Sequence, residues 1–154
     1  VAESGLKKHK DLIMLKENGI NIFLIGESLM KEQDLESATK KILGICLGQQ
    51  AIGEVFGAKL INLEKVYHGI ATPVTITEDD LLFRDLPKTF EIGRYHSWVI
   101  ETPLPNDLIA TSFDEQGQLM SLRHKTYHVR GVQFHPESIL TPNGKKILEN
   151  WINS

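Results

Sequence analysis

The sequence contains a single cysteine among its 154 residues, and it has no long run of apolar residues. One thiol can form neither an internal disulfide nor the cage of a structural zinc site, and it is typical of a reducing compartment. We therefore expect a cytoplasmic protein. The apolar runs are too short to cross a bilayer, so we expect no membrane segment. Val1–Ser4 show no basic and apolar signal-peptide pattern, and no secretory leader is expected.

Positive charge is also scarce: 17 lysines and arginines face 20 acidic residues, which leaves a net charge of −3. The basic stripe typical of nucleic-acid binding is missing, so no nucleic-acid partner is expected. The six histidines are dispersed, and nothing indicates a metal or an organic cofactor. With 41% apolar and 24% charged residues, the composition is that of a folded globular protein. We expect residues 1–154 to form a single α/β domain.

Two patterns follow one another along the chain. Up to about residue 60, apolar runs alternate with amphipathic stretches, which predicts parallel strands joined by right-handed crossovers. The expected elements there are helix 7–18, strand 20–25, helix 34–41, strand 41–46 and helix 49–56. From about residue 72, strands and turns prevail, with expected strands 73–77, 108–113, 119–123 and 129–134 and a last helix 142–151 capped by Thr141. The sequence therefore predicts a layered α/β sheet with antiparallel strands added late.

The cysteine lies in the stretch Gly44–Gly48, between an apolar run and an expected helix. A glycine two residues before and two residues after Cys46 allows a strand to turn sharply into a helix and to expose the central side chain. The helix N-terminus would then favour a thiolate and an oxyanion. The alternative is a core cysteine, since free cysteines are among the most buried residues.

A candidate base follows in the stretch GVQFHPE, residues 131–137. A cysteine nucleophile needs a base, and the base needs an acceptor that orients it. His135 and Glu137 are two residues apart, so in extended backbone their side chains leave the same face. The alternative is a histidine at a strand end beside a surface glutamate, with no catalytic role.

Four motifs appear in order after residue 41: GICLGQQ, VYHGIATPV, GRYHSWVI and MSLRHKTYHVRGVQFHPESILTPNGKKILENW. With them, residues 42–154 resemble the class I (triad) glutamine amidotransferases, and most of all the glutaminase subunits of anthranilate synthase and aminodeoxychorismate synthase. The resemblance implies a three-layer, flavodoxin-like, mostly parallel sheet flanked by helices, with antiparallel strands added in the C-terminal half.

The resemblance also implies a reaction. Cys46 would attack the side-chain carboxamide of L-glutamine, His135 would move the proton and Glu137 would hold the imidazole. Ammonia would pass to a chorismate-binding synthase subunit. The implied substrate contacts are the Leu47 N–H as an oxyanion donor and Gln50, Ser97 and Trp98 around the glutamine, the last two mainly through backbone atoms.

Residues 1–41 depart from this family, because its opening Asp-Asn-Tyr-Asp strand and its Gly/Pro-rich oxyanion loop are both absent. They resemble instead the C-terminal βαβα segment of indole-3-glycerol phosphate synthase, a (β/α)₈ barrel, through ESG-x-K and GIN-x-FLIGESLM. The loops after the last two barrel strands bind phosphate. The matching positions are Ser4, Gly5, Gly26 and Ser28, and Gly26 is also our candidate for the missing oxyanion donor.

The chain is thus interpreted as a chimera joined near residue 41. The favoured function is a glutaminase subunit of tryptophan biosynthesis, with the p-aminobenzoate pathway as an alternative because acceptor chemistry belongs to the partner. Two other functions stay open: an inactive hybrid without a complete oxyanion hole, and a weak phosphate-binding βα module. His68 and His96 are expected to be structural or to shape the pocket rather than to be catalytic. His124 and His128 are expected to lie on a solvated strand face.

Overall fold

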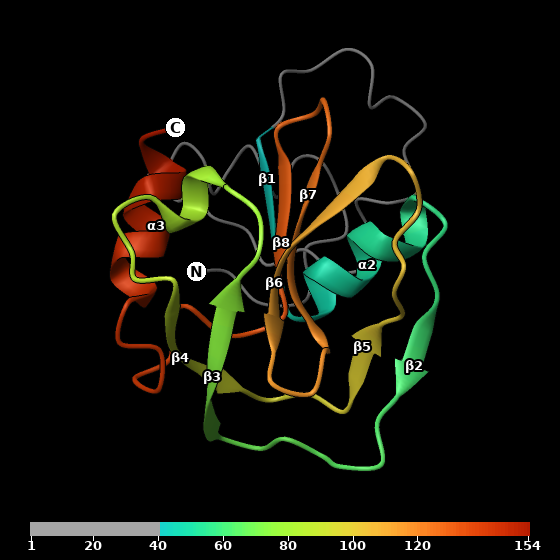
Figure 1. The fold of residues 1–154 in the computed structure, drawn as a ribbon, viewed down its shortest axis with the longest axis horizontal. Helices are drawn as coiled ribbons and strands as arrows, with labels where there is room; N and C mark the ends of the chain where they lie inside the picture. Colours follow the sequence, from blue (N-terminus) through green and yellow to red (C-terminus); the bar gives the residue numbers. More distant parts are fainter. Residues whose placement is uncertain (1–40) are drawn as a thin grey trace, which may run out of the picture.

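The computed structural model describes residues 41–154, and the elements expected before residue 41 lie outside this range (Figure 1). The described elements, in chain order, are β1 (Ile42–Ile45), α2 (Leu47–Val55), β2 (Leu60–Asn62), β3 (Ile70–Ile76), the 3₁₀ helix η2 (Leu81–Phe83), β4 (Thr89–Arg94), β5 (Trp98–Ile100), β6 (Leu108–Asp114), β7 (Leu119–His124), β8 (Val129–Val132) and α3 (Gly144–Ile152).

Six of these strands form one sheet in the order β1-β8-β7-β6-β3-β4, and β2 pairs with β5 in a small second sheet. Within the described residues, β1 runs parallel to β8, and the other neighbours of the large sheet are antiparallel. The α/β class is confirmed, with a mixed sheet. The further parallel strand that the pattern predicts, strand 20–25, lies outside the described residues.

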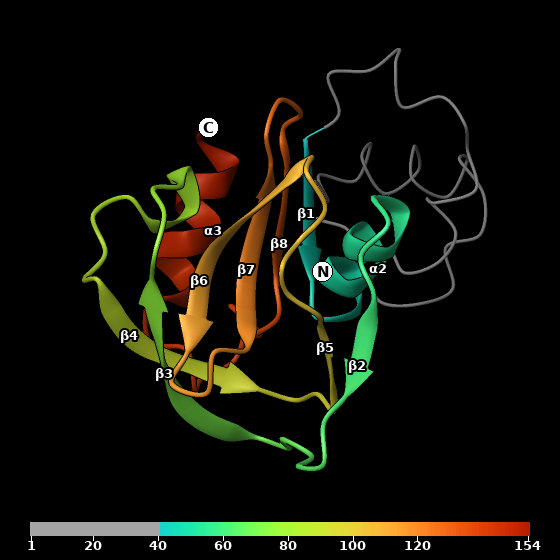
Figure 2. The same ribbon diagram turned by 45° about the vertical axis from the view of Figure 1, so that its right-hand side comes forward.

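The helices α2 and α3 lie on opposite sides of the large sheet, as both ribbon views show (Figures 1 and 2). On the α3 side, Ile147 and Trp151 are four residues apart and therefore share one helix face, which packs into the larger apolar cluster. On the α2 side, Ile52 packs with Leu119 and Leu122 of β7. Burying a large apolar side chain contributes roughly 1.5–3 kcal/mol, so both faces of the sheet contribute to stability.

The last helix begins later than the sequence predicts. It starts at Gly144 with Asn143 at the N-cap, because the hydroxyl of Thr141 is bonded elsewhere. That hydroxyl accepts the Gly93 N–H at 2.9 Å and donates to the His135 carbonyl at 2.7 Å. The expected cap residue instead ties the segment after β8 to β4.

Two further expectations are corrected, and three strands, β2, β4 and β5, are additional to those that the sequence predicts. First, β8 ends at Val132 rather than at residue 134. His124 does not lie on a solvated face: it is buried, and its Nδ1 accepts the backbone N–H groups of Thr126 and Tyr127. Its ring therefore closes the turn between β7 and β8.

Candidate active site

The site begins where two parallel strands end together. Cys46 directly follows β1, and its N–H donates to the Val132 carbonyl at the end of β8 at 2.8 Å. His135 follows β8 by three residues. Because neighbouring parallel strands point their carboxyl ends to the same sheet edge, residues far apart in the sequence meet there. The expected thiol and imidazole are thus delivered to one place.

The backbone at Cys46 has the shape of a nucleophile elbow. Its φ of 54° and ψ of −106° lie in a region that non-glycine residues rarely adopt, at a cost of about 1–3 kcal/mol. A Cβ added at Gly44 would lie 2.5 Å from the carbonyl carbon of Gly48, so glycine is required there. A Cβ at Gly48 would meet nothing within 4 Å, so the sharp turn needs only the first of the two glycines on steric grounds.

His135 and Glu137 form a hydrogen-bonded pair, with Nδ1 and Oε1 2.7 Å apart. The pKa of His135 is raised to about 10, most strongly by its interaction with the Cys46 side chain and then by Glu137, while partial burial acts in the opposite direction. For Glu137, burial alone would raise the pKa of the carboxyl group. The hydrogen bond and charge of His135, together with a backbone N–H, outweigh it and lower that pKa. At neutral pH an imidazolium therefore lies between a carboxylate and the sulfur.

Several contacts fix the position of the imidazole. The His135 N–H donates to the Gly93 carbonyl at 3.1 Å, and its carbonyl accepts the Thr141 hydroxyl. The Tyr95 ring meets the His135 ring edge-on at 5.1 Å between centroids. The Tyr95 hydroxyl is in turn 3.0 Å from that of Ser138. The ring is thus held by β4 as well as by its own segment.

All of the predicted site residues that the structure describes line one cleft of about 940 Å³: Cys46, Leu47, Gln50, Ser97, Trp98, His135 and Glu137. His68 and His96 line it too, as expected of pocket-shaping residues. The predicted positions Ser4, Gly5, Gly26 and Ser28 lie outside the described residues. The second oxyanion donor therefore stays a prediction.

The polar groups expected to hold glutamine are partly used by the protein itself. The Nε2 of Gln50 donates to the Trp98 carbonyl at 2.8 Å and to the Gln133 Oε1 at 3.1 Å. The Ser97 carbonyl accepts the Leu63 N–H at 2.7 Å. Because both hydrogens of the Gln50 amide are engaged, this side chain can meet a ligand only through its Oε1, as an acceptor.

Sequence reasoning missed Gln133, whose Nε2 donates to the Cys46 sulfur at 3.6 Å. It also gave no role to Arg94, which is fully buried beneath the cleft. Both residues fall inside the quoted motifs, GVQFHPE and GRYHSW. A buried glutamine carries no charge and no sequence periodicity, so the available signal was its place two residues before His135 in the motif.

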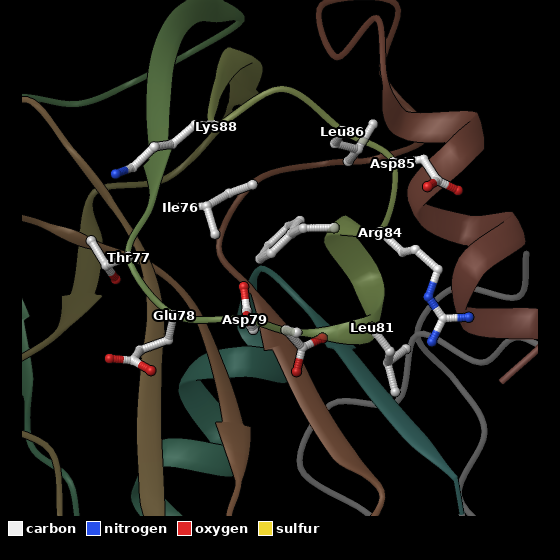
Figure 3. Close-up of a pocket in the computed structure, with 11 residues that line it drawn as sticks. Ile76, Thr77, Glu78, Asp79, Leu81, Arg84, Asp85, Leu86 and Lys88 are labelled. Carbon is white, nitrogen blue, oxygen red and sulfur yellow. The ribbon is translucent and has the colours of Figure 1, made fainter.

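A second hollow of about 740 Å³ lies between the end of β3 and η2 (Figure 3). Glu78 and Asp79 border it, while Asp85 points toward α3, where it meets Lys146 at 3.3 Å. None of the predicted site residues lines it. In residues 41–154 no group of three or more His, Cys, Asp or Glu side chains could hold a metal ion. No helix of that range is long and apolar enough to span a membrane.

An α/β sheet with a cysteine at a strand-to-helix elbow, and a histidine–glutamate pair just after the adjoining parallel strand, defines a class of proteins with a potential thiol nucleophile. The chain belongs to the class I glutamine amidotransferases: the family model "Glutamine amidotransferase class-I" matches residues 2–154. The predicted family is thereby confirmed. The matched range also includes most of the segment whose motifs resemble the barrel enzyme.

Individual relatives agree with this family. The chain is 48% identical over 120 residues to the chloroplastic anthranilate synthase beta subunit 1 of Oryza sativa subsp. japonica, a match that covers 74% of this chain and 42% of the relative. It is 42% identical over 118 residues to aminodeoxychorismate synthase component 2 of Klebsiella aerogenes, covering 76% of this chain and 63% of the relative.

A crystal structure of a Thermoplasma acidophilum protein, assigned to GMP synthase, superimposes with a TM-score of 0.73 at 30% identity. That match covers 82% of this chain and 61% of the other. This chain therefore spans between 42% and 63% of the length of these relatives.

Proposed function

We propose that the chain is a glutaminase subunit that hydrolyses L-glutamine and supplies ammonia to a chorismate-using synthase partner. The observation that carries the proposal is the meeting of Cys46, at a strained elbow, with the His135–Glu137 pair in one cleft. Cys46 would act as nucleophile, His135 as acid and base, and Glu137 as the group that orients the imidazole.

The first half-reaction forms a thioester. The Cys46 thiolate attacks the carboxamide carbon of glutamine, and a carbon–sulfur bond forms as the carbonyl oxygen takes up negative charge. The carbon–nitrogen bond then breaks, and the His135 imidazolium gives its proton to the nitrogen, which leaves as ammonia. The raised pKa of His135 supports this order, because the ring holds a proton when the nucleophile attacks.

The second half-reaction releases glutamate. Water attacks the thioester carbon while neutral His135 takes one of its protons. The carbon–sulfur bond breaks, the thiolate re-forms beside the imidazolium, and the product carboxylic acid loses its proton to solvent. Glu137 keeps the imidazole in one tautomer through Nδ1 in both halves, so that Nε2 exchanges the proton.

The oxyanion would face the first turn of α2. The opening N–H groups of a helix have no partners within that helix, and they carry its positive end. Leu47 is the first residue of α2, so its N–H is our candidate donor. Gly26 is our candidate for the second donor. Loss of one such donor typically lowers the rate 10²- to 10³-fold.

Exposed apolar side chains around the cleft support a partner subunit. Leu47, Val66 and Ile139 line the cleft, yet their exposed fractions are 69%, 64% and 95%. Contiguous exposed apolar residues are typical of interaction sites. The relatives named above are components of anthranilate and aminodeoxychorismate synthases, which favours a chorismate-using partner. The pathway, tryptophan or p-aminobenzoate, depends on that partner.

We further propose that residues 1–41 descend from the last βα units of an indole-3-glycerol phosphate synthase barrel, on the motifs ESG-x-K and GIN-x-FLIGESLM. In the sequence they directly precede β1, the strand that leads to Cys46. We expect a reducing compartment such as the cytoplasm, because Cys46 must stay a free thiol to act.

The test measures glutamate release from glutamine by the full chain, alone and with the chorismate-using component of each synthase. We expect release with one partner and none from the Cys46→Ser variant. A diazoketone analogue of glutamine should add to Cys46 within the active complex. An unlabelled Cys46 there would overturn the proposal. Labelling without glutamate release would identify the inactive hybrid, and stabilisation by phosphate that disappears in a Ser28→Ala variant would favour the phosphate-binding module.

A further inference from the structure

A buried hydrogen-bond chain starts beneath the cleft at Arg94. This side chain is fully buried, and its Nη1 donates to the Asp114 Oδ2 at 2.6 Å. Its guanidinium lies 3.5 Å from the centroid of the Tyr67 ring, and its Nε donates to the His96 Nε2 at 3.1 Å. Its Nη2 also donates to the Gln118 Oε1 at 2.5 Å. Arg94 is therefore held by Asp114, Gln118, Tyr67 and His96 together.

The state of His96 follows from this contact. A guanidinium has only donors, so the Nε2 of His96 must accept, and its proton must be on Nδ1. The Nδ1 lies 3.0 Å from the carbonyl oxygen of Trp98, which can only accept. Burial and, next, the charge of Arg94 lower the pKa of His96 to about 4, so the ring is neutral. The tautomer is thus fixed from both ends.

The series of hydrogen bonds continues from Trp98 toward Cys46, and the donor and the acceptor of each bond are fixed. Because the Trp98 carbonyl can only accept, Gln50 must present its Nε2 to it. The second N–H of Gln50 then reaches the Oε1 of Gln133. This turns the Nε2 of Gln133 toward the Cys46 sulfur, at 3.6 Å. A rotated Gln133 amide would set two donors against each other at Gln50 and leave the sulfur facing an oxygen.

We propose that Gln133 is a further catalytic residue, which donates an N–H to the Cys46 sulfur and holds it as a thiolate, and that Arg94 and His96 are positioning residues. They fix the Trp98 carbonyl, which orients Gln50 and, through it, Gln133. The effect on turnover rests on the proposed function, whereas the effect on the sulfur does not. Hydrogen bonds to an ionised acceptor are about twice as strong as neutral ones, so this donor favours the thiolate.

The test compares two buried glutamines. Gln133 and Gln49 are both fully buried, and in the described part of the chain the Gln49 amide has no hydrogen-bond partner. We would measure the rate at which iodoacetamide alkylates Cys46 in the folded full chain, for Gln133→Met and for Gln49→Met. We expect roughly three- to tenfold slower alkylation for Gln133→Met, because the thiolate fraction falls more than its intrinsic nucleophilicity rises. Gln49→Met should stay within about twofold of the wild type.

A second pair of variants tests the positioning residues and does not depend on whether Gln133→Met folds. An asparagine amide nitrogen can stand where the Nδ1 of histidine stands, so His96→Asn can still donate to the Trp98 carbonyl, whereas His96→Phe cannot. We expect iodoacetamide to alkylate Cys46 at close to the wild-type rate in His96→Asn and more slowly in His96→Phe. A merely structural role would move unfolding midpoints and leave these rates unchanged.

Equal alkylation rates in folded Gln133→Met and wild type, or in His96→Phe and His96→Asn, would overturn the inference. Failure of the proposed function looks different. In that case the wild-type chain would release no glutamate with any synthase partner, while the alkylation rates would still show whether Gln133 holds the sulfur.

Discussion

Ile45 and Val132 lie opposite each other at the ends of β1 and β8, the parallel pair of the described sheet. The chain leaves both strands at the same edge, so Cys46 follows one and Gln133 and His135 follow the other. One register thus places the thiol, an amide donor and the imidazole together. A shift of this register would separate them, which makes the strand pairing part of the site.

The His135–Glu137 pair predicts an order of catalytic loss. His135→Asn removes the proposed acid and base, and we expect glutamate release to fall roughly 10²- to 10⁴-fold. Glu137→Gln keeps the imidazole and loses the charge that holds it at 2.7 Å, so the fall should be smaller. Initial rates with the synthase partner measure both, with circular dichroism as the folding control. A Glu137→Gln variant that is as active as wild type would contradict the role of the carboxylate.

The same pair predicts how stability depends on pH. The folded pKa of His135, about 10, lies above the ordinary value of 6.5, so the folded protein binds more protons than the unfolded chain between these values. Its stabilising contribution is therefore complete below about pH 6.5 and is lost as the pH rises toward 10. Urea unfolding across this range should show a steeper decline for wild type than for His135→Asn. Parallel pH curves would contradict the prediction.

The meeting of Cys46, His135 and Glu137 in one cleft could be predicted because each is a reactive side chain in a short motif. Cys46 lies between glycines, and His135 and Glu137 share one extended segment. The α/β class followed in the same way from alternating apolar runs. These are local properties of the sequence, and local patterns are what a sequence displays most directly.

What could not be predicted depends on contacts between distant segments. The donors and acceptors in the series of hydrogen bonds that links Arg94 with Gln133 are set only when β4, α2 and β8 pack against one another. Thr141 has the chemistry of an N-cap, but its hydroxyl is used by Gly93 and His135. The strands β2 and β5 have three residues each, too few to display a periodicity.

The elbow predicts opposite outcomes at its two glycines. A methyl group at Gly44 would lie 2.5 Å from the backbone of Gly48, and Gly44→Ala should lower the free energy of unfolding by about 3 kcal/mol. At Gly48 the added methyl meets nothing within 4 Å, so Gly48→Ala should change that free energy by less than about 1 kcal/mol. Chemical denaturation of the two variants measures both. Equal destabilisation would show that the turn needs both glycines.

The two buried glutamines predict opposite changes in stability. Gln49 buries an amide that finds no partner within residues 41–154, and such an unpaired group typically costs about 1–3 kcal/mol. Gln49→Met keeps the unbranched shape that packs against Gly131, and it should raise the free energy of unfolding by about 1 kcal/mol. Gln133→Met breaks two bonded contacts and should lower it. Urea denaturation provides the comparison, and a destabilised Gln49→Met would reveal a partner outside the described residues.

The buried ion pair beneath the cleft predicts non-additive losses. Arg94 and Asp114 are 2.6 Å apart with side chains 0% and 1% exposed. Arg94→Met leaves an unpaired buried carboxylate and should cost about 3–5 kcal/mol. Adding Asp114→Asn removes that charge, while the oxygen of the new amide can still accept the backbone N–H groups of Gln116 and Gln118 that Asp114 accepts. The double variant should therefore be more stable than the sum of the single losses predicts. Strictly additive losses in urea unfolding would show that Arg94 and Asp114 stabilise the fold independently, and that the guanidinium is anchored by Tyr67, His96 and the Gln118 side chain.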